Sequence, residues 1–358
     1  MNYLYRSSSP IFQNKISKTF EDSLSIPIKE ISIDYSSSNH CYENVLFEDI
    51  NDDYDFDYDN NQNASSRFKE HISNIIDEFT KRFNKRTIFV EIGCGNGYFL
   101  NELQQNGFMN VMGYDKAYKG SLPYIVPNFL EDANHCLADV IILRHTLEHI
   151  KNPKSFLAFL SNIKTPKGKK PDIYIEVPNM NHILEQLLFE DVFYEHVNYF
   201  TPQSFGNIFK NGDCLNTFDG QYISLFASLD DLIFDQFESN LPIGSDAKFT
   251  QLQERKENII NHYCNQNVVI WGCGAKGNTL AFMLKQKNPN IVVACVDVDT
   301  NKQGKYLSGS GFLIQSFESV TNIESYDVIL VMNASYLNEI KNIVPIEYHN
   351  KLKTLESQ

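Results

Sequence analysis

Short apolar runs alternate with longer stretches of helical spacing over most of the chain. Between residues 65 and 83 the apolar side chains recur every three or four positions and form one stripe of a helix. The run at 139–143 is almost continuously apolar, which is typical of a strand buried in a parallel sheet. The same reasoning predicts strands at 87–92, 111–114 and 172–177, two more near 217 and 222–227, and helices at 98–105, 156–163 and 202–209.

The alternation starts again after a connecting helix expected at 248–263, with strands at 267–271, 291–297 and 326–331. We therefore predict an α/β protein with two Rossmann-like domains, at 66–240 and 241–358, of which the second is smaller. Residues 1–65 are polar and are expected to form an irregular N-terminal arm or lid. Their acidic, tyrosine-containing stretch at 52–59 is either a solvated charge run or a lid that reaches the active site.

A glycine turn follows the first strand of the larger domain. Gly93, Gly95 and Gly97 stand between that strand and a helical pattern, and Asp115 ends the next strand. A strand, a glycine turn, a helix and an acid ending the second strand form a nucleotide-binding half-unit. The glycines permit backbone conformations and a close ligand approach that a Cβ would obstruct. Asp115 can accept hydrogen bonds from both hydroxyls of a ribose.

The second domain opens with a similar turn, Gly272-x-Gly274-x-x-Gly277, and its second strand ends in Asp297. By pattern alone this turn is the better dinucleotide fingerprint of the two. Lys276 inside the turn is unusual for NAD and indicates an anionic group nearby.

Composition excludes several classes of function. The formal net charge of −14 disfavours nonspecific binding of nucleic acid or of an anionic membrane surface. The chain has no apolar run long enough to span a membrane and no secretory signal at its N-terminus. The seven cysteines have no framework spacing, which suits a reducing cytoplasm. The oligomeric state is left open.

Glu91, two residues before Gly93, makes the first turn similar to motif I of class I S-adenosylmethionine (SAM) methyltransferases. Two further segments resemble a narrower family, the C-methyltransferases that act on nucleotide-linked keto-deoxysugars. Tyr194-Glu195-His196-x-x-Tyr199-Phe200 resembles that family's Glu-His-x-x-Tyr-Phe signature, and 274–279 resembles the Lys-Gly-Asn-Thr segment that opens its C-terminal domain. The resemblance implies a class I methyltransferase domain followed by the smaller Rossmann-like domain.

Two departures from that family stand out. The family usually begins with a small zinc domain held by cysteines, but only Cys41 precedes Cys94 here, so we expect that domain to be absent. Phe193 occupies the position of a family tyrosine, with Tyr194 one place later. The second departure leaves the proton-transfer roles, the sugar and the methylated atom open.

The resemblance implies SAM as the cofactor and suggests which residues hold it. The expected cofactor site comprises Glu91, Gly93, Cys94, Gly95, Gly97, Asp115 and Arg144, with Leu130 at the adenine.

Methylation of a carbon needs a base to remove a proton next to a ketone and a donor at the enolate oxygen. Histidine suits the base, because its ordinary pKa is about 6.5. His196 and Glu195 are therefore expected to be catalytic, with Tyr194 or Tyr199 as the donor. His145 and His149 are also expected among the catalytic residues. They would share a face if their segment is helical, which is also metal-like spacing. No third ligand is apparent in the sequence, so no metal is expected.

The acceptor is expected to be a nucleotide-activated sugar, with its diphosphate near Lys276, Gly277 and Asn278 and with Tyr58 at the entrance. Two other functions are left open. One is a SAM-dependent O- or N-methyltransferase acting on a glycan precursor or small metabolite. The other is an NAD-linked or nucleotide-sensing protein that uses the second glycine turn.

Overall fold

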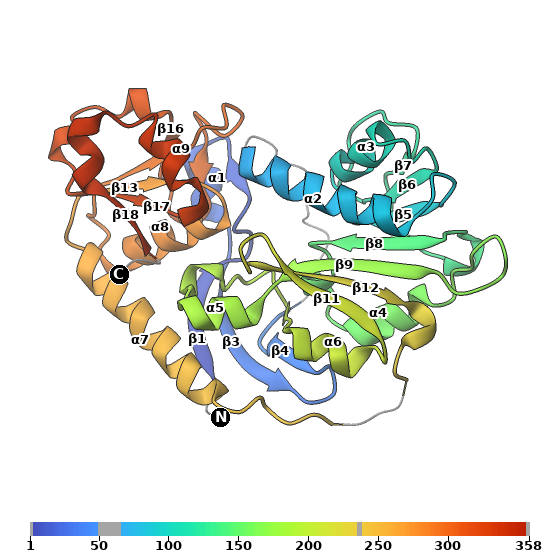
Figure 1. The fold of residues 1–358 in the computed structure, drawn as a ribbon. Coiled ribbons are helices and arrows are strands. Elements are labelled where there is room, and N and C mark those ends of the chain that lie inside the picture. The colour runs from blue at the N-terminus through green and yellow to red at the C-terminus, as the bar shows by residue number, and fades with distance from the viewer. Residues whose placement is uncertain (1–2, 49–65, 235–237, 356–358) are drawn as a thin grey trace.

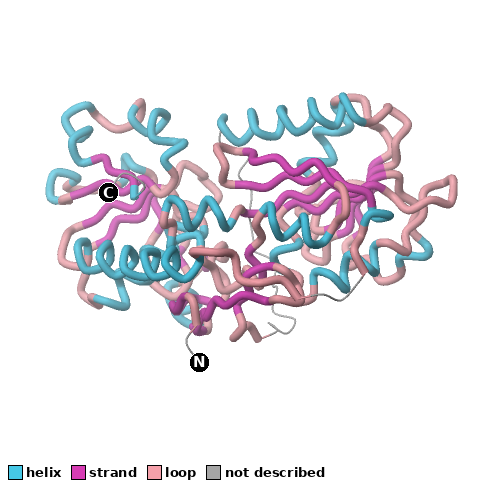
Figure 2. Tube along the Cα trace, turned by 60° about the horizontal axis from the view of Figure 1, so that its bottom comes forward, coloured by secondary structure: helices cyan, strands magenta, loops and turns pink. Residues whose placement is uncertain are grey.

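Two α/β lobes, each built around its own sheet, lie side by side (Figures 1 and 2). The computed structural model describes residues 3–48, 66–234 and 238–355. The larger lobe has a seven-stranded sheet in the order β11-β12-β9-β8-β5-β6-β7, and the smaller lobe has a five-stranded sheet in the order β16-β14-β13-β17-β18. The predicted α/β fold class is therefore confirmed.

The larger lobe follows the apolar pattern closely. Its strands β9, β8, β5, β6 and β7, in sheet order, run parallel to one another. The hairpin β11–β12 pairs antiparallel with the β9 edge of this sheet. The strands are β5 (Phe89–Ile92), β6 (Val111–Tyr114), β7 (Ile125–Val126), β8 (Val140–Arg144), β9 (Asp172–Pro178), β11 (Gly212–Thr217) and β12 (Tyr222–Ser228). The helices are α2 (Ser66–Arg82), α3 (Tyr98–Gln105), α4 (Pro153–Leu160), α5 (Met180–Gln186) and α6 (Pro202–Ile208), with 3₁₀ turns η1 (Ala133–His135), η2 (Leu147–His149), η3 (Phe189–Asp191) and η4 (Leu229–Asp231). Only α5 among these five helices was not predicted.

The smaller lobe has an all-parallel sheet. It is reached through the long helix α7 (Ser245–Tyr263). Its strands are β13 (Val268–Trp271), β14 (Val293–Val296), β16 (Ile314–Gln315), β17 (Val328–Val331) and β18 (Leu352–Thr354). Its helices are α8 (Ala275–Lys287) and α9 (Leu337–Lys341), with 3₁₀ turns η5 (Phe317–Ser319), η6 (Ile323–Ser325), η7 (Ala334–Tyr336) and η8 (Ile346–Lys351).

The described N-terminal residues 3–48 are regular, so the expectation of an irregular arm is wrong for them. They form β1 (Tyr5–Pro10), β2 (Ile16–Ser17), α1 (Phe20–Ser25), β3 (Ile28–Ser36) and β4 (Cys41–Asn44). The first, third and fourth of these strands form one sheet with β10 (Asn198–Tyr199) of the larger lobe, and β2 pairs with β15 (Tyr306–Leu307) of the smaller lobe. These strands contain many polar residues, such as the serines of β1, so they do not form a recognisable apolar pattern in the sequence. The acidic stretch at 52–59 lies outside the described residues.

The N-terminal segment also connects the two lobes through the backbone of one residue, Gln13. The N–H of Gln13 donates to Glu195 Oε2 at 2.9 Å, and the carbonyl of Gln13 accepts from Asn278 Nδ2 at 3.0 Å. One buried apolar cluster takes members from the same three regions, including Ile31, Phe189 and Leu280. The relative position of the two lobes therefore depends on residues near the N-terminus.

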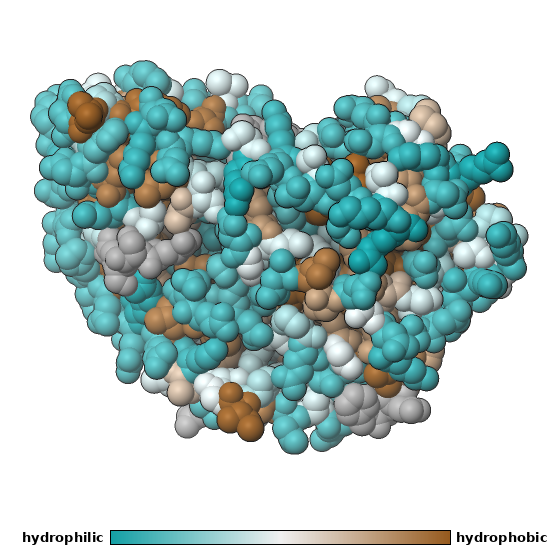
Figure 3. All heavy atoms as spheres, viewed as in Figure 1, coloured by the Kyte–Doolittle hydropathy of each residue, from teal (hydrophilic) through white to brown (hydrophobic). Residues whose placement is uncertain are grey.

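The face of the molecule in Figure 3 is mostly hydrophilic, with apolar residues scattered in small groups. Within the described ranges, no helix combines the length and the apolarity needed to cross a membrane.

Asn278 is fully buried, and within the described residues its side-chain amide is the donor that holds the Gln13 carbonyl. We expect Asn278→Ala to lower the free energy of unfolding by about 1–3 kcal/mol, because it leaves a buried carbonyl without its donor. Urea unfolding measures this effect. Asn290→Ala, at an exposed position just after α8, is the matched control and should change nothing. Equal stability of both variants would contradict the structural role of Asn278.

Candidate active site

The first glycine turn has the backbone that its sequence predicts. Gly93, Gly95 and Gly97 have φ values of +73°, +54° and +81°, a region that residues with a Cβ rarely adopt. A Cβ on Gly93 would run into Thr146, and one on Gly97 would run into Ile125. A Cβ on Gly95 would meet nothing within 4 Å, so the space beside this residue is open to a ligand.

Asp115 follows β6 and faces this turn. Its Oδ2 accepts from the N–H of Gly95 at 2.8 Å, and its Oδ1 accepts from the N–H of Ala117 at 2.8 Å. A carboxylate has about four lone-pair directions, so both oxygens can still accept from ribose hydroxyls. Asp115 thus supports the turn and remains available to a ligand.

Glu91, at the end of β5, lies beside the same turn with its side chain buried. Burial raises the pKa of Glu91 to about 8, although the charge of Arg144 opposes this shift. No hydrogen-bond partner is found for Glu91 Oε2 among the described residues. A buried carboxyl group with an unsatisfied oxygen fits the ammonium group of an amino-acid ligand such as SAM, whose positive charge would favour the ionised form. The residues of the turn therefore fit this cofactor.

Two other expected cofactor residues lie close to the turn. The Cys94 side chain is buried, and its Sγ occupies the space where Gly113 would carry a Cβ. Leu130 is partly buried and packs against a buried apolar cluster of the larger lobe. Both positions suit a structural contribution to the floor of the cofactor site.

A buried carboxylate that sequence reasoning missed organises the next strand ends. Glu176 on β9 is completely buried, and its Oε1 accepts from Arg144 Nε at 3.1 Å and from Arg144 Nη2 at 2.8 Å. His71 Nε2 of α2 lies 3.0 Å from Glu176 Oε2, to which the Tyr174 hydroxyl also donates. Burial opposes ionisation of Glu176, but the charge of Arg144 and the bonds from His145 and His71 hold its pKa well below the usual range. The sequence does contain a signal for Glu176, because it is an acidic residue inside an otherwise apolar predicted strand.

Arg144 was expected at the cofactor, but its guanidinium is directed at Glu176 and lies over the ring of Phe99 at 4.6 Å. Its role in this structure is to neutralise buried carboxylates below the site.

His145 does not begin a helix. Its φ is +49°, and only Leu147–His149 forms a 3₁₀ turn, so the predicted helical face shared with His149 is wrong. His145 lies between two buried acids, with Nδ1 3.5 Å from Glu148 Oε1 and Nε2 3.4 Å from Glu176 Oε1. Burial opposes its protonation, but these acids outweigh that effect and raise the pKa of His145 to about 9. The imidazole is therefore charged at neutral pH.

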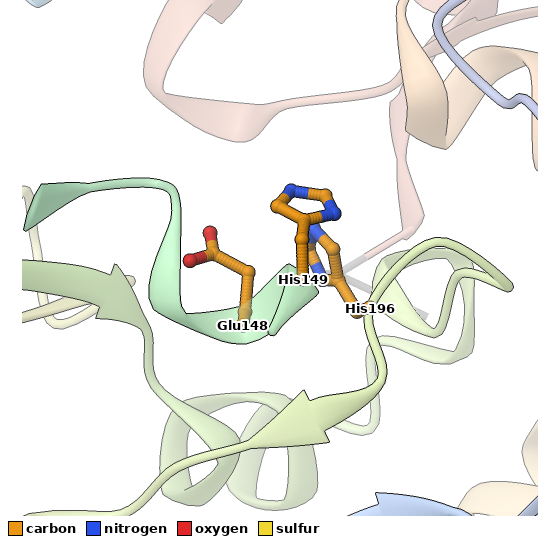
Figure 4. Close-up of side chains that lie close together, drawn as sticks. All are labelled: Glu148, His149 and His196. Atoms are coloured by element: carbon orange, nitrogen blue, oxygen red, sulfur yellow. The ribbon is translucent and has the colours of Figure 1, made fainter. Parts of the chain in front are cut away.

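His149 and His196 face each other, with ring centroids 5.0 Å apart (Figure 4). His149 comes from η2, and its Nδ1 lies 2.9 Å from the carbonyl oxygen of Glu195. His196 comes from the loop before β10. Burial, reinforced by His149, lowers the pKa of His196 to about 3, so this imidazole is neutral. Glu148 completes the cluster, because one ligand atom from each of the three side chains lies within 4.8 Å of the others.

These histidines line a cavity of about 310 Å³ between the two lobes. One end is formed by His145, Glu148, His149 and His196 of the larger lobe. The other end is formed by the second glycine turn and the residues after β14. Phe193, Tyr222 and Tyr336 line the cavity as well. Sequence reasoning missed Tyr222, which packs edge-on against His145 with ring centroids 4.6 Å apart.

Three of the expected catalytic side chains are used elsewhere and are not among the residues that line this cavity. The Tyr199 hydroxyl donates to the carbonyl of Phe193 at 2.8 Å and accepts from its N–H at 2.9 Å. The Tyr194 hydroxyl accepts from the N–H of Glu48 at 3.0 Å. Glu195 is buried and accepts from the Gln13 backbone. These contacts give the three side chains a structural role, while Tyr58 lies outside the described residues.

The second glycine turn repeats the arrangement of the first. Asp297 Oδ2 accepts from the N–H of Cys273 at 2.8 Å, and Oδ1 accepts from the N–H of Asp299 at 2.9 Å. Lys276 lines the cavity and lies 2.7 Å from Asp191 Oδ2 of η3. Gly277 packs so closely that a Cβ would run into the carbonyl of Gly272. Of the three expected acceptor residues in this lobe, Lys276 and Gly277 line the cavity, whereas the buried Asn278 does not.

Two protein families match parts of the chain. Residues 62–216 match the family described as "Methyltransferase domain", and residues 264–351 match "C2185-like, N-terminal". A search of curated protein sequences finds no match to this chain.

Solved structures of methyltransferases are similar to part of the chain. One is the plantazolicin methyltransferase BpumL in complex with a pentazolic substrate analogue and SAH (13% identity, 46% of this chain and 86% of that chain, TM-score 0.34). Another is a SAM-dependent methyltransferase from Aquifex aeolicus (14%, 46% and 99%, TM-score 0.31). A third is magnesium protoporphyrin IX methyltransferase from Synechocystis PCC 6803 with bound SAH (15%, 45% and 83%, TM-score 0.32). Likeness at these TM-scores carries no argument about the acceptor.

The matched methyltransferase segment spans the glycine turn, Asp115 and the β8–β9 edge, which are the parts that fit SAM. Residues 62–216 of the chain therefore match a methyltransferase domain, and the glycine turn within them fits SAM as the cofactor.

Proposed function

We propose that this enzyme methylates a carbon atom of a nucleotide-linked keto-deoxysugar. The observation that carries the proposal is the cavity between the lobes, which joins the histidine cluster of the methyltransferase lobe to the second glycine turn. An acceptor that fills it would be elongated, with its reacting end at His149 and His196 and its other end at Lys276. The resemblance of the Glu195-His196 and Lys276-Gly277 segments to the nucleotide-sugar family supports the same acceptor.

The cofactor would lie on the turn from Gly93 to Gly97. Asp115 would accept from its ribose hydroxyls, Glu91 would face its ammonium group, and Leu130 would contact its adenine. When bound, SAM supplies a methyl group activated by its sulfonium. The cofactor residues need only hold that methyl in line with the acceptor atom.

At the reacting end, a carbon acceptor requires removal of a proton next to its ketone and stabilisation of the resulting oxyanion. His149 and His196 present imidazole rings to this end of the cavity. The charged imidazole of His145 adds a positive potential that favours an enolate.

At the far end, two lysines and two acids suit a nucleoside diphosphate. Lys276 and Lys302 line the cavity and offer positive charge to phosphates. Asp297 and Asp299 line it too, and carboxylates can accept from ribose hydroxyls.

The seven cysteine thiols are free and six are buried, which supports the cytoplasmic location that we propose.

Mass spectrometry with SAM and nucleoside-diphosphate keto-deoxysugars in deuterated water tests this function. Carbon methylation predicts a methylated product. It also predicts that the enzyme exchanges the acceptor's C–H next to the ketone for deuterium. Methylation without that exchange would point to oxygen or nitrogen as the acceptor atom. No product with any keto-sugar would contradict the proposal.

Asp115→Ala should weaken SAM binding by about 1–3 kcal/mol, the scale of losing hydrogen bonds to a charged acceptor. This corresponds to roughly 5- to 150-fold in Kd by calorimetry. Asp297→Ala is the matched control, because Asp297 holds the second turn in the same way but lies in the other lobe. Unchanged SAM affinity in Asp115→Ala would remove the cofactor assignment.

His196→Asn should reduce turnover by roughly 10²–10⁴, because it removes an imidazole from the reacting end of the cavity. SAM affinity should stay near that of the wild type, since His196 lies at the acceptor end. His262→Asn on the exposed face of α7 is the control and should keep full turnover. Normal turnover of His196→Asn would make the histidine structural.

Lys276→Ala should raise the KM of the nucleotide acceptor more than that of SAM, because it removes a positive charge from the far end of the cavity. Lys287→Ala, in the last turn of the same helix, should leave both values unchanged. Steady-state kinetics separates the two substrates. Tight, stoichiometric NADH binding that is lost in Gly274→Val would instead assign this turn to a dinucleotide.

A further inference from the structure

We propose that Glu148, His149 and His196 bind a divalent metal cation at the acceptor end of the cavity. The binding itself is independent of the proposed function, but the role of the cation, holding a keto oxygen of the acceptor, rests on it.

The geometry brings the distant His196 to two neighbouring residues of η2, Glu148 and His149. One oxygen or nitrogen atom from each side chain lies within 4.8 Å of the other two (Figure 4). Around a tetrahedral metal with bonds of about 2.1 Å, ligand atoms are about 3.4 Å apart. Small rotations of these side chains would therefore close the site. Two imidazoles and one carboxylate are a ligand set found in catalytic zinc sites.

The ligand atoms are also short of hydrogen bonds. Among the described residues, no hydrogen-bond partner is found for His196 Nδ1 or for either carboxylate oxygen of Glu148, although all three atoms are buried. His145 Nδ1 lies 3.5 Å from Glu148 Oε1, beyond ordinary hydrogen-bond distance. Leaving buried polar atoms unsatisfied costs free energy, so such atoms normally have partners. A cation held by Glu148, and by His196 through Nδ1, would give these atoms a partner.

A further contact presets one ligand. His149 Nδ1 lies 2.9 Å from the carbonyl oxygen of Glu195, and a carbonyl can only accept, so Nδ1 is the protonated nitrogen. The Nε2 atom of His149 then carries the lone pair that a metal needs. A ring nitrogen bonded to a backbone carbonyl is the usual outer support of a metal-binding histidine.

All three ligands line the cavity, so a bound cation would keep coordination positions open to the acceptor. An oxygen of the acceptor, keto or hydroxyl, is the chemical group that would fill such a position. The expected phenol donors, Tyr194 and Tyr199, are hydrogen-bonded elsewhere. A cation would supply positive charge at the place where those phenols are missing. Imidazole ligands favour zinc, copper, iron or nickel over magnesium, calcium and manganese.

The test uses the full chain, first stripped of metal with a chelator and then titrated with Zn²⁺ and Mn²⁺ by calorimetry. We expect one equivalent of zinc to bind, with a Kd at least tenfold weaker in His149→Ala, His196→Ala and Glu148→Gln. Co²⁺ should give visible absorption bands that depend on the same residues. His182→Ala is the matched control, because His182 lines the cavity outside the cluster. Glu148→Gln preserves shape, which guards against a variant that simply fails to fold.

Absence of zinc binding, or binding unaffected by His196→Ala and Glu148→Gln, would overturn the metal site. Methylation of a keto-sugar at full rate by chelator-treated, metal-free enzyme would overturn the proposed role of the cation and would leave the proposed function intact. Stoichiometric zinc binding at the cluster without methylation of any keto-sugar would support the site and contradict the proposed function instead.

Discussion

The backbone of Gln13 is the link on which the cavity depends. Its N–H binds the carboxylate of Glu195, one residue before His196, and its carbonyl binds Asn278, two residues after Lys276. The backbone of one residue thus joins the loop that carries the reacting end to the helix that carries the far end. Since the cavity is lined from both lobes, its length is set by this connection and by the buried apolar cluster around it.

Buried charge at the carboxyl edge of the larger sheet is the second constraint. Glu91, Glu148 and Glu176 are each at most 2% exposed, and Arg144 and His145 lie among them. Isolated ions would be costly here, so the acids and bases must neutralise one another. The result is a rigid floor under the cofactor turn, with His145 charged on one side and the neutral His196 on the other. Asp191 of η3, which pairs with Lys276, connects the segment before His196 to the second glycine turn.

The parts of the fold that have a one-dimensional pattern could be predicted from the sequence. Buried parallel strands such as β8 are continuous apolar runs, and the glycine turns need residues without a Cβ. The sheet of residues 3–48 could not be predicted in this way, because strands such as β1 gain their stability from pairing with β3 and have a mixed polar sequence. The charge network escaped for another reason. His71 and Glu176 are 105 residues apart, and only the fold brings them to 3.0 Å.

The candidate site shows the same division between residue type and placement. The sequence singled out His145, His149 and His196, and all three line the cavity. It could not show that Tyr194, Tyr199 and Glu195 would be engaged by Glu48, Phe193 and Gln13, because those contacts depend on the N-terminal sheet and the loop before β10. Nor could it place Glu148 beside both imidazoles as a third ligand.

A crystal structure with SAH and a nucleoside-diphosphate keto-deoxysugar tests the central claim, that one acceptor spans the cavity between the lobes. We expect the sugar carbons to lie against His149 and His196 and the diphosphate to lie beside Lys276. A nucleotide bound wholly within one lobe, or a sugar remote from both histidines, would contradict the account.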